Sequence, residues 1–249
     1  RDVLGSRGLG DVYKRQENVL DNFVAENKSL YSAVEQAKAS VLYPPNGMNM
    51  LILGETGVGK SMFVSLIHKY GIEMKKFLEN SPLITFNCAD YANNPQLLLG
   101  QLFGCKKGAY TGADSDKIGL IEKANNGILF LDEVHRLPSE GQEMLFTFMD
   151  KGIYRRLGET EFERKAKVLI VCATTESPEK VLLKTFTRRI PMTIHIPSLA
   201  ERSIEERFSL ISTFMKDESA RLDKEIKVSM NSIKAVSYTH LTLPTTPYV

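Results

Sequence analysis

The sequence contains few cysteines, no long apolar run and little net charge. Its three cysteines (Cys88, Cys105 and Cys172) have no metal-ligand spacing, and their odd number suits reduced thiols in the cytosol. No apolar run reaches the roughly 18 residues that span a bilayer. The net charge of +2 comes largely from residues 1–16, so bulk charge gives no reason to expect direct nucleic-acid binding. These absences predict a cytoplasmic protein that does not associate with a membrane.

The histidines do not indicate a metal site. His68, His135 and His195 share no metal-ligand spacing. We expect them at the surface or at helix ends.

The two ends of the chain differ from the rest. Residues 237–249 contain no Asp, Glu, Lys or Arg, and neither they nor residues 1–16 show a helical period. Both ends resemble translated sequencing-adapter read-through, so we leave 1–16 and 235–249 out of fold reasoning. The remaining segment, 17–234, has the length and composition of one α/β domain, and we expect it to be cut from something longer.

Between these ends, apolar runs alternate with segments of helical period. The expected strands are 48–53, 83–88, 128–131, 168–174 and 193–196. The expected helices include 30–41, 60 to about 69, one from Pro95, 118–124, one behind Ser139, and a last one with the stripe Ile204, Phe208, Ile211 and Met215. Ser139 with Gln142, and Ser203 with Glu206, have the spacing of capping boxes. This alternation predicts an α/β fold with a parallel sheet covered on both faces.

A glycine-rich loop follows the first expected strand and opens a helix, which is the setting that a P-loop requires. Its residues are Gly54, Glu55, Thr56, Gly57, Val58, Gly59, Lys60 and Ser61. Backbone N–H groups would wrap a β-phosphate, Lys60 would bridge the β- and γ-phosphates of ATP, and Ser61 would ligate Mg²⁺. The alternative is a glycine-rich turn that matches by chance.

An acidic pair, Asp132-Glu133, ends the expected strand 128–131 in the manner of a Walker B motif. Asp132 would hold the Mg²⁺ shell, and Glu133 would polarise the attacking water as general base. Without the upstream P-loop, such a pair is usually a solvated turn. Together, the two motifs predict nucleoside triphosphate hydrolysis.

A third segment, between the two phosphate motifs, consists of Gly108, Ala109, Tyr110, Thr111, Gly112 and Ala113. Its two flanking glycines predict a flexible hairpin that projects an aromatic ring and a hydroxyl into solvent. A globular protein would normally avoid exposing Tyr110 in this way unless a partner covers it. The alternative is a tight surface turn that has no partner.

With these three motifs in order, residues 24–217 resemble the central AAA+ ATPase domain of bacterial enhancer-binding proteins, which activate RNA polymerase carrying the sigma-54 factor. The resemblance extends to Leu102-Phe-Gly104 and Gly127-Ile-Leu-Phe-Leu-Asp-Glu133; the family carries Phe where this chain has Tyr110. It implies a P-loop AAA+ three-layer sandwich and a ring, usually a hexamer, whose loop tips grip the sigma factor. It also implies DNA binding through a module outside this chain.

A finer resemblance is to the subgroup of activators attached to sugar phosphotransferase-system regulatory domains. It is carried by Tyr43-Pro-Pro, Cys172-Ala-Thr-Thr-Glu176 and Thr187-Arg-Arg-Ile-Pro191. The family's helical lid would begin near the foreign tail, so we expect it to be largely missing.

The resemblance also implies roles for four residues outside the phosphate motifs. Asn87 matches the asparagine that restrains the catalytic glutamate, although a strand-end amide also caps turns. Thr175 stands where the family usually carries an asparagine sensor of the γ-phosphate. One of Arg188 and Arg189 matches an arginine supplied to a neighbouring subunit's nucleotide; the alternative is a surface pair with local ion pairs. Leu182 stands at the position of the family's other such arginine and cannot serve.

The sequence therefore predicts an ATPase that remodels the closed complex of sigma-54 polymerase. A different AAA+ machine, such as a helicase or unfoldase, would need another pore-loop signature in place of Gly108–Ala113. A nucleotide-binding switch that no longer hydrolyses is the other alternative, and the intact Glu133 argues against it.

Overall fold

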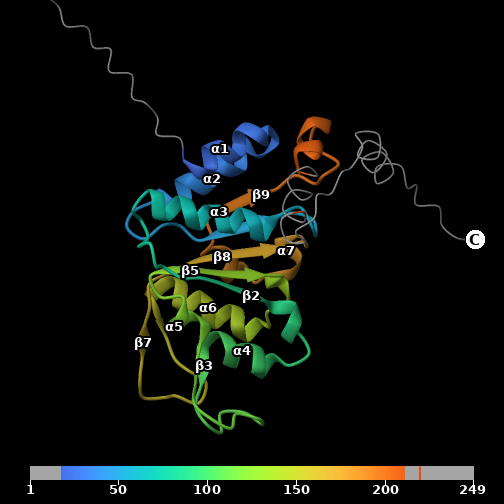
Figure 1. The fold of residues 1–249 in the computed structure, drawn as a ribbon. Coiled ribbons are helices and arrows are strands. Elements are labelled where there is room, and N and C mark those ends of the chain that lie inside the picture. The colour runs from blue at the N-terminus through green and yellow to red at the C-terminus, as the bar shows by residue number, and fades with distance from the viewer. Residues whose placement is uncertain (1–17, 211–218, 220–249) are drawn as a thin grey trace, which may run out of the picture.

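The computed structural model describes residues 18–210 and 219, which form an α/β sandwich of three layers (Figure 1). Its central sheet has five parallel strands in the order β2-β5-β8-β1-β9. The strands are β1 (Met50–Leu53), β2 (Leu83–Asn87), β5 (Gly127–Asp132), β8 (Val168–Thr174) and β9 (Met192–His195). The predicted parallel sheet is therefore confirmed, with strand ends within two residues of those expected.

Helices cover both faces of the sheet, and each face has its own apolar core. On one face lie α1 (Val19–Glu26), α2 (Tyr31–Leu42) and α3 (Lys60–Glu73), which pack on a core that includes Val34, Phe63 and Ile67 (Figure 1). On the other lie α4 (Pro95–Phe103), α5 (Leu120–Lys123) and α6 (Ser139–Lys151), around Leu98, Phe103 and Leu145. Two short helices, α7 (Pro178–Val181) and α8 (Lys184–Thr187), connect β8 to β9. Buried side chains on both faces explain why the strands read as nearly continuous apolar runs.

Two small antiparallel pairs stand outside the main sheet: β3 (Gly104–Cys105) with β4 (Lys117–Ile118), and β6 (Ile153–Tyr154) with β7 (Arg164–Lys165). The expected helix 118–124 was wrong at its start, because β4 occupies residue 118 and only Leu120–Lys123 is helical. A Cβ on Gly119 would lie 2.3 Å from the backbone carbon of Phe103. The chain crosses itself too closely at this glycine for a regular helix to begin earlier.

The predicted caps are partly wrong. Pro138, not Ser139, is the N-cap of α6, and the Gln142 amide instead donates to Leu137 O and accepts from Leu183 N. The Ser203 hydroxyl does accept from Glu206 N at 3.2 Å at the start of a helix over 204–210. The rest of that predicted stripe, the predicted lid and both foreign-looking ends lie outside the described residues.

Cysteine and membrane expectations can be checked in the part of the chain that is described. Cys88, Cys105 and Cys172 are free and buried, and burial raises the pKa of the Cys172 thiol. Within 18–210 and 219, no helix has the length and apolar character needed to cross a membrane. The same residues contain no cluster of His, Cys, Asp and Glu suited to a metal ion.

Gly127, the first residue of β5, provides a stability prediction. A Cβ built there would lie 2.0 Å from the carbonyl oxygen of Pro82, a backbone atom that cannot move aside without disturbing β2. We expect Gly127→Ala to lower the free energy of unfolding by about 1–3 kcal/mol. Gly141→Ala is the comparison and should cost less, because its Cβ meets the side chains of Leu99 and Leu137 but no backbone atom, and alanine favours a helix. Urea denaturation of both variants tests this; equal midpoints would contradict it.

Candidate nucleotide site

The predicted phosphate motifs meet at the carboxyl ends of adjacent strands. The P-loop follows β1, Asp132 ends β5, and Thr174 ends β8; register pairs Leu53 with Thr174, and Asn87 with Asp132. In open parallel sheets, ligands bind in the crevice at this edge. The fold thus brings together residues that are far apart in the sequence.

The P-loop has backbone geometry that glycine supplies. Gly57 and Gly59 have φ of 82° and 97°, and Gly59 is the N-cap of α3. Lys60, 6% exposed, donates from Nζ to the carbonyl oxygens of Gly54 (2.9 Å) and Glu55 (3.0 Å). The lysine side chain thus folds back over its own loop, and its ammonium group binds the first two carbonyl oxygens of that loop. Ser61 lies exposed in the first turn of α3.

Sequence reasoning missed Arg202, which joins this loop to the segment after β9. The residue is 3% exposed, and its guanidinium donates to Val58 O at 2.8 Å and to Pro197 O at 3.3 Å. Burial lowers its pKa. Nearby, the Glu206 carboxylate accepts from Ser29 N at 2.8 Å and from the Ser29 hydroxyl at 2.5 Å. The contacts of Arg202 with Val58 and of Glu206 with Ser29 have no local sequence signal, because each joins segments more than 140 residues apart.

The acidic pair has an unusual backbone. Glu133 has φ 49° and ψ 45°, a left-handed conformation that is uncommon for residues other than glycine, and its N–H donates to Asp132 Oδ1 at 3.0 Å. Burial, together with the negative charges of Asp132 and Glu133, raises the pKa of the Cys88 thiol below them to about 12. Cys88 is therefore a neutral, unreactive thiol beneath this carboxylate pair.

The Glu133 carboxylate is held through one of its oxygens. Thr175 Oγ1 donates to Glu133 Oε2 at 3.3 Å, so the predicted sensor touches the predicted base. His135 Nδ1 lies 3.4 Å from the same oxygen and 2.9 Å from Thr174 Oγ1. His135 was expected at the surface or at a helix end; it lies in the short 3-10 helix Val134–Arg136 (η3), and its side chain is only 8% exposed because η3 packs it against the end of β8.

The surroundings of Asn87, Arg188 and Arg189 bear on the roles expected for these residues. The Asn87 amide caps the turn Cys88–Tyr91 (η2), accepting from Ala89 N and donating to Asp90 Oδ1, so a contact with Glu133 stays a prediction. Arg189 pairs with Asp150 Oδ1 at 2.9 Å, and its guanidinium carbon lies 5.0 Å from the centre of the Phe146 ring. Arg188 is exposed and has no ion pair within the described residues, whereas Leu182 is buried. The alternative of a surface arginine with a local ion pair therefore holds for Arg189.

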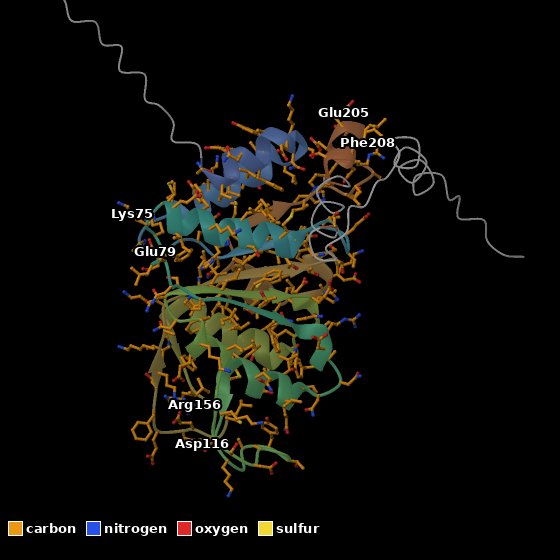
Figure 2. All side chains as sticks on the ribbon, viewed as in Figure 1. Lys75, Glu79, Asp116, Arg156, Glu205 and Phe208 are labelled. Carbon is orange, nitrogen blue, oxygen red and sulfur yellow. The ribbon has the colours of Figure 1, made fainter. Side chains whose placement is uncertain are left out.

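The loop 108–113 is a closed hairpin that follows β3, on the side of the sheet that carries α4, α5 and α6 (Figure 1). Gly108 N donates to Ala113 O at 2.8 Å, and Lys106 Nζ pairs with Asp116 at 2.8 Å, which holds the pKa of Asp116 below its usual range. Figure 2 shows Asp116 and Arg156 at its base, at the opposite end of the molecule from Glu205 and Phe208. The base also joins the β6–β7 hairpin, through Lys106 N to Leu157 O.

The expectation that Tyr110 projects into solvent was wrong. Its ring folds back onto α4, where a Cβ on Gly100 would lie 2.9 Å from both Tyr110 Cε1 and the Tyr110 hydroxyl oxygen. The glycine in the middle of α4 makes room for this ring. Thr111 and Gly112 are the exposed tip, and Gly112 has φ 97°.

Comparisons with known proteins agree with this architecture. A family model described as the Sigma-54 interaction domain matches residues 23–197. The chain is 56% identical over 219 residues to the transcriptional regulatory protein LevR of Bacillus subtilis, covering 88% of this chain and 23% of LevR. It is 43% identical over 227 residues to the transcriptional regulatory protein DagR of Salmonella typhimurium, covering 89% of this chain and 24% of DagR. It thus spans about a quarter of these relatives.

Solved structures share the fold. NtrX from Brucella abortus matches with a TM-score of 0.67 and 25% identity, covering 88% of this chain and 50% of that chain. NtrX in complex with ADP matches with a TM-score of 0.68 and 25% identity, covering 88% and 48%. The fold is thus the P-loop AAA+ sandwich, as predicted. By sequence, order of motifs and architecture, the chain belongs to the family of sigma-54 interaction domains.

Proposed function

We propose that this chain is the ATP-hydrolysing core of a sigma-54-dependent transcriptional activator. The observation that carries the proposal is the meeting of Lys60, Ser61, Asp132, Glu133 and Thr175 at one sheet edge, in a chain of the sigma-54 interaction family. NtrX, which shares the fold, has been solved in complex with ADP, and this supports nucleotide binding by this chain.

Within this proposal, the P-loop holds the phosphates of ATP. Lys60 exchanges its two carbonyl contacts for phosphate oxygens, and the exposed backbone of Glu55, Thr56 and Gly57 donates N–H groups to them. The Ser61 hydroxyl and the Asp132 carboxylate are hard oxygen donors, which fit Mg²⁺. When bound, Mg²⁺ supplies charge neutralisation on the β- and γ-phosphates.

Glu133 is the general base. Its side chain is 22% exposed, and its carboxylate takes a proton from the attacking water, while Thr175 senses the γ-phosphate. Asn87 restrains Glu133 through a contact that would require its amide to leave the η2 cap. An arginine from a neighbouring subunit completes the site, so hydrolysis depends on self-association into a ring, with the hexamer as the family's usual form.

The protein at full length would bind DNA through a module outside this chain. Phosphotransferase-system regulatory domains would lie outside it as well. Both parts of the proposal rest on the family resemblance, because the described residues belong to the ATPase domain alone.

The exposed tip Thr111–Gly112 is the proposed contact with the sigma-54 factor. Its base is connected to the rest of the domain by the Lys106–Asp116 pair and by the bond from Lys106 N to Leu157 O, so a shift of that base would move the tip. Loops carried on a rigid scaffold are the usual position for partner contacts. Nucleotide-dependent movement of this tip would remodel the closed polymerase complex.

Thr111→Ala tests this coupling in the protein at full length. It removes a hydroxyl and a methyl group outside the phosphate site, so ATP turnover should stay within about three-fold of the parent, the range of a mutation that leaves the catalytic groups in place. Capture of sigma-54 in the presence of a phosphate transition-state mimic should be lost, and open-complex formation with it.

Thr147→Ala, an exposed threonine on α6, is the matched control and should retain both activities. If turnover and sigma-54 capture fall together in Thr111→Ala, the tip has only a structural role. If capture survives, the contact lies elsewhere. Either result contradicts the assignment of the tip.

A further inference from the structure

His135 occupies a position that none of the phosphate motifs explains. It lies two residues after Glu133 in η3, with its side chain 8% exposed, between the carboxylate and the end of β8. Its Nδ1 atom is 2.9 Å from Thr174 Oγ1 and 3.4 Å from Glu133 Oε2. A buried polar ring must be paired in this way to offset its lost hydration.

The geometry favours a proton on Nδ1. A bare nitrogen would place its lone pair against the negatively charged Oε2, whereas an N–H there faces two oxygens and attracts both. Thr174 Oγ1 is itself fixed, because Thr174 is fully buried and its oxygen also accepts from Glu176 N at 3.0 Å. The imidazole is thus anchored to the strand that also supplies Thr175.

Oε2 therefore has two polar neighbours: the Thr175 hydroxyl, which donates to it at 3.3 Å, and His135 Nδ1, which lies 3.4 Å away. The other carboxylate oxygen, Oε1, has no hydrogen bond within 18–210 and 219. A carboxylate that is held through one oxygen presents the other in a fixed direction, which a base needs in order to meet a water molecule.

The backbone adds a reason for such a restraint. Glu133 is left-handed at φ 49°, a conformation that is unfavourable for residues other than glycine and persists only where its surroundings impose it. Thr175, which follows β8, bonds the Glu133 carboxylate from outside this turn, and His135, within the turn, is anchored to Thr174 of β8. Loss of the imidazole would let the carboxylate rotate.

We propose that His135 is a positioning residue for ATP hydrolysis: together with Thr175 it fixes Oε2 of Glu133 so that Oε1 is left to accept the proton of the attacking water. The inference rests on the proposed function, in which Glu133 is the base. His135 does not itself touch the nucleotide. It ties the base to the end of β8, so movement of the sensor Thr175 and movement of the base are linked.

The test is the steady-state ATPase of the full-length protein. His135→Ala should lower kcat by about 10–100-fold, the range for misplacing a catalytic group by roughly an ångström, and should leave KM for ATP within about three-fold. His135→Asn keeps an amide near the position of Nδ1 and should recover most of the lost kcat. His135→Gln places its amide near Nε2 instead and should not.

His68→Ala is the matched control. That ring donates one hydrogen bond, from Nε2 to Ser81 O at 2.9 Å, and stacks on Phe77 on the opposite face of the sheet from α6. It should alter the melting temperature without a change in kcat. Binding of a fluorescent ADP analogue, measured for each variant, shows whether the nucleotide site is still folded.

Thr174→Val keeps the proposal testable if His135→Ala fails to bind the analogue. It removes the oxygen that anchors the imidazole while keeping the side-chain shape, and kcat should again fall with KM preserved. If His135→Ala or Thr174→Val binds the ADP analogue and has an unchanged kcat, the positioning role is overturned. A parent protein that hydrolyses no ATP would instead refute the proposed function, whatever the variants do.

Discussion

Arg188→Ala is expected to lower ATP turnover of the assembled protein by about 10³–10⁵-fold, the usual contribution of an arginine finger to phosphoryl transfer. Arg188 is exposed at the end of α8 and free of ion pairs among the residues described, so it is available to a neighbouring subunit. Arg189→Ala is the control. Its guanidinium is already taken by Asp150 and the Phe146 ring, and an exposed pair of this kind contributes little, so turnover should change only a few-fold.

Mixing two inactive variants tests whether Arg188 acts between subunits. Lys60→Ala cannot hold ATP but still presents Arg188, whereas Arg188→Ala holds ATP but lacks the arginine. In equal mixture, about a quarter of the sites pair an intact P-loop with an intact neighbouring arginine, if the ring assembles at random. Activity should reappear on mixing. Absence of recovery, with mixed rings shown to form, would place the arginine's action within its own subunit.

The fold could be predicted because its signals are local. The apolar runs of β5 and β8 are buried on both faces, and Pro95 begins α4 as expected. Local patterns failed where a distant segment decided the outcome. The helix expected over 118–124 begins later because Gly119 packs against the backbone of Phe103. Gln142 forms no capping box with Ser139, because its side chain accepts a hydrogen bond from Leu183 N.

In the candidate site, too, the residues with local sequence signals were predicted and the contacts between distant segments were not. The P-loop and Asp132-Glu133 could be found from the sequence, because phosphate chemistry requires fixed residue types at fixed spacing. The fold-back of Tyr110 depends on the absence of a side chain at Gly100, ten positions earlier, which no motif records. The pairing of His135 with Thr174 was not predicted, because Thr174 is 39 residues away on β8. Spacing along the chain does not reveal such tertiary pairs.

Glu133→Gln is expected to retain ATP binding while turnover falls by about 10²–10⁴-fold, the usual contribution of a general base. The amide has the shape of the carboxylate and can keep one oxygen within reach of Thr175, so the P-loop contacts are unaffected. It cannot take a proton from water at neutral pH. Single-turnover hydrolysis and ADP-analogue binding, measured on one preparation, separate the chemical step from affinity.

Glu176→Gln is the matched control, because it removes one negative charge from the same edge of the sheet at an exposed residue that does not contact Glu133 in the described structure. If the charge of the edge controlled turnover, the two variants would fall alike. The proposed mechanism requires a large loss in Glu133→Gln and turnover near that of the parent in Glu176→Gln. Turnover of Glu133→Gln within two-fold of the parent would remove Glu133 from the mechanism, and with it the reason for holding its carboxylate between Thr175 and His135.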